Sequence, residues 1–550
     1  MPEPTESAGT NRRQSSLSRS GRAAAVGTLA SRGSGFVRTV VIASALGTAA
    51  LGNAYATANT IPNIVYELLL GGILTSVVVP LLVAAEHDGG GESYAQRLLS
   101  LVVYGLGALV VVLVVAAPLV IDVYGRGFTP AQRDLAVLFS RFFLPQIFFY
   151  GVGAVLGAIL NTRGSYAAPM WAPVLSNVVV VATGVLFVLV TPAASRAPHE
   201  LPHGSAVLLA AGTTLGIVAQ TVVLVPGLRS VGFRLRLRRD LRGVGLRRTW
   251  GRARWMLVYV AANQLGLVVL VALANRAEAA ARDADVVEAG YATYAYAFQL
   301  FLLPHAVVAV TVITMLLPRM SRAATAGRLA DLRLDLSRGS RMAIAALVPA
   351  AVALVVLHRE IAVVVFARGA TSLEQAAVIG EVMAGFALGL VPFSLFQLQL
   401  RAFYALGDTR TPALVNIGVN VVNVFAAVGL YAVLAPSHRI TGMAVAYALS
   451  YAVGLALTSR ALGGRIGGLD GAAIVRTAAR VGLCAAVAGF AAGTIVLTAD
   501  DAVGTGAVAA VIVLAGGAGA GAAAFALVAW RMHIPELGAL IDAALGRRGR

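Results

Sequence analysis

Two arginines lie inside the first long apolar stretch of the sequence, residues 24–46. Arg32 and Arg38 are six residues apart, or about 600° of rotation on an ideal helix, so they do not share a face. Gly33 and Gly35 could loosen the helix and let both side chains reach one cavity. Guanidinium groups bind phosphate well, and a charge inside a membrane helix usually has a function. We therefore predict an anion site, with Arg38 the stronger candidate because Arg32 could extend to the membrane surface.

The next apolar stretch carries a stripe of polar and small residues at every fourth position. Residues four apart lie on one helix face, and a polar face inside a membrane must contact protein or water. The stripe consists of Asn59, Asn63, Glu67, Gly71 and Thr75. Its first three members join the candidate substrate-binding residues, and Glu67 is the natural counter-charge for either arginine. A structural Arg–Glu pair that touches no substrate is an equal alternative.

Further amide side chains occur in later apolar stretches, and most are expected to bind neighbouring helices. They are Asn263, Gln264, Gln299, Gln397, Gln399, Asn416, Asn420 and Asn423. Gln299 and Tyr296, three residues apart, could face a cavity, so Gln299 is added to the candidate site. We find no catalytic, metal-binding or phosphate-loop motif, and predict no cofactor. The single cysteine, Cys484, excludes an internal disulfide.

The composition predicts that the candidate residues are carried by membrane helices. Of 550 residues, 58% are hydrophobic and 12% are charged, whereas soluble proteins are about a quarter charged. Mean hydropathy is +0.82. These values exclude a soluble enzyme, a disordered chain and a disulfide-rich secreted domain. The predicted fold class is an all-α polytopic membrane protein.

The net charge is +18, and all 43 basic residues are arginine. They lie between apolar runs rather than in a separate basic domain, so nucleic-acid binding is rejected. With the N-terminus in the cytoplasm, 32 arginines fall in the tails and inner loops, nine in outer loops and span edges, and two within the first span. The positive-inside rule then predicts that both termini are cytoplasmic.

This topology rests on fourteen predicted transmembrane spans. Their approximate ranges are 24–46, 57–85, 98–122, 135–160, 167–191, 206–228, 255–274, 289–317, 342–366, 375–400, 411–434, 440–459, 477–498 and 505–530.

An internal repeat relates spans 4–5 to spans 10–11. Pro145 precedes Arg163 by 18 residues, and Pro392 precedes Arg410 by the same distance. A four-residue difference after the arginine brings Asn177 and Asn420 of the following spans into register. The offset of six spans predicts two six-helix lobes in parallel pseudo-repeat plus two C-terminal helices, with a substrate site between the lobes. Coincidence between two loops of similar composition is the alternative.

The predicted parts of the chain follow from these lobes. They are a cytoplasmic tail at 1–23, an N-lobe at 24–228, a basic cytoplasmic linker at 229–254, a C-lobe at 255–462, spans 13 and 14 at 463–530, and a cytoplasmic tail at 531–550. Apolar residues and arginines alternate in the linker. An amphipathic helix on an anionic membrane surface, a strand and a solvated linker are all compatible with that pattern.

Several segments together resemble a known family. They are Thr28–Arg38, Ala58–Asn63, Val78–Pro80, Pro145–Arg163 and Leu316–Arg319. Their order and spacing, over roughly 24–460, resemble the lipid II flippase family (MurJ/MviN), especially its actinobacterial members. The family belongs to the multidrug/oligosaccharidyl-lipid/polysaccharide exporter superfamily. The resemblance implies a non-enzymatic transporter in the bacterial plasma membrane that moves undecaprenyl-pyrophosphate-linked peptidoglycan precursor to the outer leaflet.

The resemblance also implies roles for parts of the chain. Arg32 and Arg38 match first-span arginines that grip the pyrophosphate or sugar head group, and spans 13 and 14 would form a groove for the lipid tail. The sequence departs from the Gram-negative pattern at Thr39, Asn53, Tyr66 and Gln299. Thr39 and Asn53 stand in place of acids, and Tyr66-Glu67 and Gln299 in place of arginines. The cavity is therefore expected to be less positive.

The expected mechanism is alternating access of the two lobes. Because the sequence has no ATP-binding motif, the expected energy source is the membrane potential or a monovalent cation gradient. Expected partners are membrane lipid and cell-wall synthesis proteins, and the oligomeric state is left open. Three rivals stand beside this interpretation. They are an exporter of another polyprenyl-linked oligosaccharide, a multidrug/ion antiporter, and a non-transporting scaffold for cell-wall enzymes.

Overall fold

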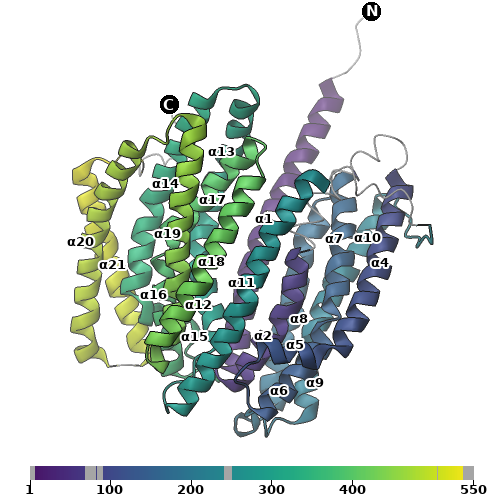
Figure 1. The fold of residues 1–550 in the computed structure, drawn as a ribbon, viewed down its shortest axis with the longest axis horizontal. Coiled ribbons are helices and arrows are strands. Elements are labelled where there is room, and N and C mark those ends of the chain that lie inside the picture. Colours follow the sequence, from purple (N-terminus) through teal and green to yellow (C-terminus); the bar gives the residue numbers. More distant parts are fainter. Residues whose placement is uncertain are drawn as a thin grey trace, which may run out of the picture. The chain divides into compact units, whose positions relative to one another are not determined.

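The computed structural model describes residues 7–68, 82, 91–240, 250–504, 506–534 and 536. Within these ranges all regular secondary structure is helical (Figure 1). The chain divides into two compact units. Unit 1 comprises Met1–Ala45, Ala54–Val123 and Thr129–Val260, and unit 2 comprises Leu46–Asn53, Tyr124–Phe128 and Ala261–Arg550.

The first part of the chain supplies the helices of unit 1. They are α1 (Ser7–Leu46), α2 (Ala50–Glu67), α4 (Gly91–Val115), α5 (Ala117–Tyr124), α6 (Pro130–Phe143), α7 (Gln146–Thr162), α8 (Ala167–Val190), α9 (His203–Val222) and α10 (Leu224–Ser230), with a 3-10 turn at Ala193–Ser195. Local sequence sets some of these boundaries. Thr129 caps α6 by accepting a hydrogen bond from the backbone of Gln132, and Pro130 fills the first helical position, where no donor is needed.

Unit 2 contains most of the remaining helices. They are α11 (Trp250–Asp283), α12 (Tyr291–Pro304), a π-helical turn η4 (His305–Ala309), α13 (Val310–Thr325), α14 (Leu329–Val356), α15 (His358–Phe366), α16 (Leu373–Ala387), α17 (Leu390–Ala405), α18 (Arg410–Val433), a 3-10 turn at Pro436–His438, α19 (Arg439–Ile466), α20 (Gly471–Val503) and α21 (Ala507–Met532). A capping box of Ser372 and Gln375 begins α16.

Aromatic packing and close helix approach hold unit 2 together. Phe298, Phe301 and Tyr447 contact the fully buried Phe386 with ring centroids 5.3 to 5.5 Å apart. The last two helices pack on each other, α20 also contacts α14, and α21 contacts α15. Glycine permits this approach, because a Cβ at Gly489 would lie 2.7 Å from a methyl group of Val352.

The predicted count of fourteen spans is not confirmed. Among the described residues, eleven helices are long and apolar enough to cross a membrane, or twelve if the bent pair Leu373–Ala387 and Leu390–Ala405 is one span. The helix α1 does not qualify, because serines, glycines and arginines dilute its apolar residues. The predicted span 57–85 lies largely outside the described residues.

Two other local expectations change. The helix α11 continues to Asp283, beyond the predicted end at 274, so Arg276 and Arg282, which were assigned to outer loops and span edges, lie on this helix. In the predicted linker, residues 233–240 form neither helix nor strand. The amphipathic helix is therefore not found in that stretch, and residues 241–249 lie outside the described part of the chain.

Candidate functional site

Arg38 lies on α1 beside aromatic hydroxyl groups of unit 1. Its side chain is half-buried and interacts electrostatically with Tyr55 on α2 and Tyr150 on α7. The hydroxyl of Tyr55 is 2.9 Å from that of Thr213 on α9. Tyr66 packs on Tyr150 with ring centroids 4.4 Å apart. Arg38 is thus a half-buried cation in the neighbourhood of these tyrosines of unit 1.

Arg32 occupies a different environment from Arg38. It is exposed, as the six-residue separation on a helix predicts. Residues 7–46 form one uninterrupted helix, so Gly33 and Gly35 do not break it. The structure therefore does not bring the two arginines to one face of α1.

The helix α1 is held by Asn177 of α8. The amide nitrogen of Asn177 donates to the hydroxyl of Ser34 at 2.9 Å and to the carbonyl of Ser31 at 3.3 Å. These contacts hold α1 on either side of Arg32.

The stripe on α2 is partly accessible. Asn59 is half-buried, whereas Asn63 and Glu67 are exposed. The amide of Asn63 donates to the carbonyl of Asn59 at 3.0 Å. Among the described residues Glu67 forms no ion pair with Arg38, so the predicted counter-charge is not found there. The remaining members of the stripe, Gly71 and Thr75, lie outside the described residues, as does the segment Val78–Pro80.

The two candidates on α12, Gln299 and Tyr296, lie in different environments. Gln299 is half-buried, whereas Tyr296 is buried and stacks on Phe366 with ring centroids 5.6 Å apart. Tyr296 is thus a packed core residue rather than a cavity residue, and only Gln299 is retained as a candidate.

A buried polar junction in unit 2 joins Asn53 to two residues, Asn275 and Glu278, that were not predicted from the sequence. Asn53, Asn275 and Glu278 are all fully buried. The amide nitrogen of Asn53 donates to Asn275 Oδ1 at 2.8 Å and to Glu278 Oε2 at 2.5 Å. Its carbonyl oxygen accepts from the backbone of Ala292 at 2.9 Å, and Asn275 donates to the carbonyl of Tyr124 at 2.7 Å.

This junction explains the departure at position 53. An acid was expected there, and the structure instead places the carboxylate of Glu278 against Asn53. Arg282 lies 3.6 Å from Glu278 and 3.2 Å from Glu288, which balances the buried charge. The signal was present, because Asn275, Glu278 and Arg282 are three and four residues apart on one helix face. It was overlooked because the predicted span stopped at 274.

A second amide cluster joins α11 to α18. Asn263 Oδ1 accepts from the amide nitrogens of Asn416 and Asn420, both at 2.9 Å. The prediction that these amides bind neighbouring helices is confirmed. Within the described residues, no group of three His, Cys, Asp or Glu side chains could hold a metal ion.

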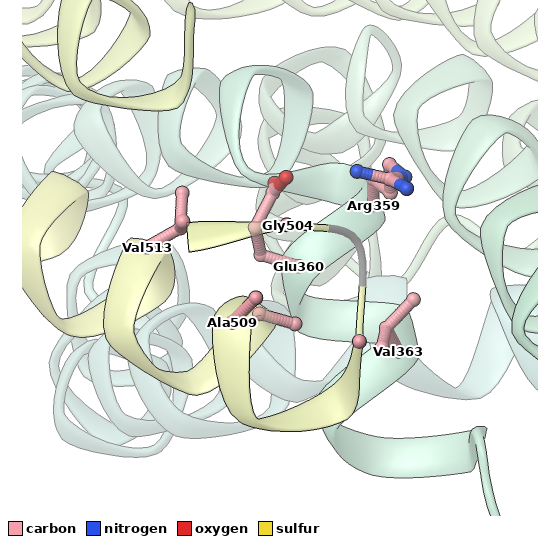
Figure 2. Close-up of a pocket in the computed structure, with 8 residues that line it drawn as sticks. Arg359, Glu360, Val363, Gly504, Ala509 and Val513 are labelled. Atoms are coloured by element: carbon pink, nitrogen blue, oxygen red, sulfur yellow. The ribbon is translucent and has the colours of Figure 1, made fainter. Parts of the chain in front are cut away.

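A small hollow lies between α15 and α21, and Figure 2 shows its lining. It is lined by Arg359, Glu360, Val363, Gly504, Gly506, Ala509, Ala510 and Val513. Its volume of about 10 Å³ corresponds to about one water molecule. This hollow therefore cannot hold a lipid head group.

Comparison with known proteins decides the family. The family model described as lipid II flippase MurJ matches residues 42–512. The chain belongs to the lipid II flippase MurJ family. The predicted family resemblance is thereby confirmed. Arg32 and Arg38 precede the matched range, so the match itself does not include them.

Relatives within the MurJ family cover most of this chain. A probable lipid II flippase MurJ of Rhizobium meliloti is 29% identical over 426 residues, which is 76% of each chain. The lipid II flippase MurJ of Burkholderia cenocepacia is 28% identical over 405 residues, covering 72% of this chain and 74% of the relative.

Solved structures show the same fold. The lipid II flippase MurJ in an inward closed conformation matches with a TM-score of 0.73 and 17% identity, covering 93% of this chain and 98% of that one. An inward-facing multidrug resistance MATE transporter matches with a TM-score of 0.60 and 16% identity, covering 79% and 94%. At these identities the likenesses show the fold alone.

Proposed function

We propose that this protein moves the undecaprenyl-pyrophosphate-linked peptidoglycan precursor from the inner to the outer leaflet of the bacterial plasma membrane. The observation that carries the proposal is membership of the lipid II flippase MurJ family over residues 42–512. Proteins of this family are transporters, not enzymes. The chain is accordingly a multi-pass membrane protein that serves peptidoglycan synthesis.

The physical problem is the charged head group. A pyrophosphate cannot cross hydrocarbon unaided, because burying an unpaired charge is too costly. In this proposal the half-buried Arg38 binds it by charge-assisted hydrogen bonds. Arg32, Asn59, Asn63, Glu67 and Gln299 are the further proposed substrate contacts.

The proposed architecture has fourteen spans, with two six-helix lobes in parallel repeat that alternate access to the substrate. The contacts of Asn177 and Asn420, which occupy equivalent repeat positions, support it. Each donates a hydrogen bond to a long helix of its own unit, Asn177 to α1 and Asn420 to α11. The helices α20 and α21 would form the lipid-tail groove. They pack together and carry strongly exposed apolar side chains, including Phe490 and Trp530.

The energy source in this proposal is the membrane potential or a monovalent cation gradient. Both termini are proposed to be cytoplasmic, because this orientation places most arginines inside. Cell-wall synthesis proteins are the proposed partners. The fold shared with a MATE transporter favours a multidrug/ion antiporter as the second candidate function, and the experiment below separates the two.

The test is a depletion experiment in the native host. Labelled precursor is chased while the leaflet that holds the lipid-linked peptidoglycan unit is probed. We expect the unit to accumulate on the inner leaflet after depletion, and wild type but not Arg38→Ala to restore export. Arg126→Ala, which removes an exposed arginine from the loop between α5 and α6, is the matched control and should restore export.

Other outcomes would contradict the proposed substrate or the proposed role of Arg38. If the precursor still reaches the outer leaflet after depletion, this chain does not carry lipid II. Accumulation of another polyprenyl-linked glycan would identify that glycan as the substrate, whereas drug sensitivity alone would favour the antiporter. Full export by Arg38→Ala would remove Arg38 from the site without overturning the substrate.

A further inference from the structure

An open basic hollow lies in unit 2 where α13 turns into α14. It has a volume of about 380 Å³, enough for a phosphate-bearing head group. It is lined by Arg319, Arg322, Ala323, Arg328, Asp331, Leu334, Asp335 and Arg338. None of these residues is among the binding residues predicted from the sequence.

Two of the four arginines are neutralised by the two aspartates. Arg319 Nη2 lies 2.9 Å from Asp335 Oδ1, and Asp335 is buried, which fixes this pair in the wall of the hollow. Arg328 Nη1 lies 3.4 Å from Asp331 Oδ2 at the start of α14. These pairs shape the hollow but add no net charge to it.

The other two arginines leave a net charge of +2. Among the described residues, neither Arg322 nor Arg338 has a carboxylate within ion-pair distance. Arg322 uses one donor on the carbonyl of Pro318 at 3.3 Å, so its remaining donors point elsewhere. Both side chains are exposed and line the same hollow from α13 and α14. Two guanidinium groups around one space suit a phosphate.

The surroundings indicate a membrane lipid rather than a soluble ion. The helix α13 ends one apolar span, Tyr291–Thr325, and α14 begins the next, Leu329–Val356, so the turn between them lies where the chain leaves the apolar zone. Met315, Leu329 and Leu334 are 46%, 37% and 45% exposed. Cationic and apolar surface therefore meet at this site, as a phospholipid requires.

We propose that this hollow binds the phosphate of an anionic phospholipid, with Arg322 and Arg338 as its ligands. The lipid's acyl chains lie along the exposed apolar side chains of α13 and α14. The site is separate from the proposed pyrophosphate contact at Arg38, and it does not depend on the identity of the transported substrate.

The test measures binding of phosphatidylglycerol to the full-length purified protein in detergent by native mass spectrometry. The double variant Arg322→Gln, Arg338→Gln should bind at least about tenfold more weakly, since each arginine contributes about a factor of five at an anionic surface. The matched control is Arg476→Gln, Arg480→Gln, which removes the same charge from exposed positions on α20. It should bind within about twofold of wild type.

Three further measurements complete the test. Phosphatidylcholine and soluble glycerol phosphate should bind weakly to wild type. The charge-retaining variant Arg322→Lys, Arg338→Lys should keep most of the affinity, which shows that loss in the glutamine variant is not misfolding. Equal loss in the control variant, unchanged binding in the glutamine variant, or tight binding of glycerol phosphate would each overturn the proposal. Because no transport is measured, failure here leaves the proposed flippase function unaffected.

Discussion

Asn177 on α8 and Asn420 on α18 hold long helices in their two units by the same kind of contact. Asn177 donates to Ser34 on α1 at 2.9 Å, and Asn420 donates to Asn263 on α11 at 2.9 Å. A glycine of the long helix lies beside each amide, at Gly35 in unit 1 and Gly266 in unit 2. The predicted repeat places these two asparagines at equivalent positions.

The two contacts differ in chemistry. In unit 1 the asparagine meets a hydroxyl and a backbone carbonyl, whereas in unit 2 three amides bind one another. Three residues after the glycine, α1 carries Arg38 and α11 carries Val269. One arrangement of helices thus supports a cation in unit 1 and a neutral amide cluster in unit 2. The proposed contact of Arg38 with the pyrophosphate therefore has no charged counterpart at the corresponding position of α11.

The largest expected effect comes from removing that cation. Arg38→Ala should lower lipid II export by about ten- to a hundredfold, because a hydrogen bond to a charged group contributes about 1.5 to 3 kcal/mol. Val269→Ala, at the corresponding position of α11, should leave export within about twofold. Both are measured by the rate at which labelled precursor appears in the outer leaflet. Equal losses in the two variants would break the comparison.

The two glycines should tolerate a methyl group differently. A Cβ at Gly266 would lie 2.4 Å from Asn420 Oδ1, whereas one at Gly35 would lie 3.6 Å from Asn177 Nδ2, an ordinary contact. Gly266→Ala should therefore destabilise the protein by about 1 to 3 kcal/mol, and Gly35→Ala by less than about 0.5 kcal/mol. Thermal unfolding in detergent measures both. A larger loss in Gly35→Ala would contradict the packing described for unit 1.

Loss of the asparagine in unit 1 should have a smaller effect. Asn177→Ala removes the contacts with Ser31 and Ser34, and a hydrogen bond between membrane helices contributes about 0.6 kcal/mol on average. We expect a loss of about 0.5 to 1 kcal/mol, measured by the same unfolding experiment. The double variant Asn177→Ala, Ser34→Ala should be no less stable than Asn177→Ala alone. An additive loss would show that the two side chains act independently.

The two corresponding turns of the predicted repeat should respond differently to low pH. Asp408, in the turn between α17 and α18, accepts backbone hydrogen bonds from Arg410 and Thr411 and contacts Arg465 at 2.5 Å. Burial acts to raise the pKa of Asp408, but the hydrogen bonds from Thr411 and the guanidinium of Arg465 hold it below the ordinary value of 3.8. The equivalent residue in unit 1 is Asn161, which does not titrate.

Because its pKa is lowered in the folded protein, Asp408 stabilises the fold only while its carboxylate is ionised. The unfolded chain takes up the proton first as pH falls, so the contribution of Asp408 is present above about pH 4 and is lost as pH falls through 3.8 toward the lower folded value. Asp408→Asn should reduce the fall in melting temperature between pH 5 and pH 3. The corresponding change in the free energy of unfolding is about 0.5 to 1 kcal/mol. An unchanged pH dependence would show that Asp408 is not the titrating group.

Sequence reasoning was most successful where a single helix decides the outcome. The apolar composition determined an all-helical membrane protein, because hydrocarbon requires every backbone group to be bonded internally. The six-residue separation of Arg32 and Arg38 predicted different faces, and one is exposed while the other is half-buried. Amides such as Asn263 were assigned to helix contacts, since an amide in a membrane seeks a partner.

Only the tertiary structure decided which side chains meet. The carboxylate beside Asn53 comes from Glu278, more than two hundred residues away in the chain, and spacing along one helix contains no information about that distance. Tyr296 is buried against Phe366 because α15 packs there, although its spacing from Gln299 suited a cavity. The sequence by itself therefore determined the class of protein, the helical faces and the family. Tertiary packing alone determined which side chains from distant segments meet, because contacts between helices depend on how those segments approach one another.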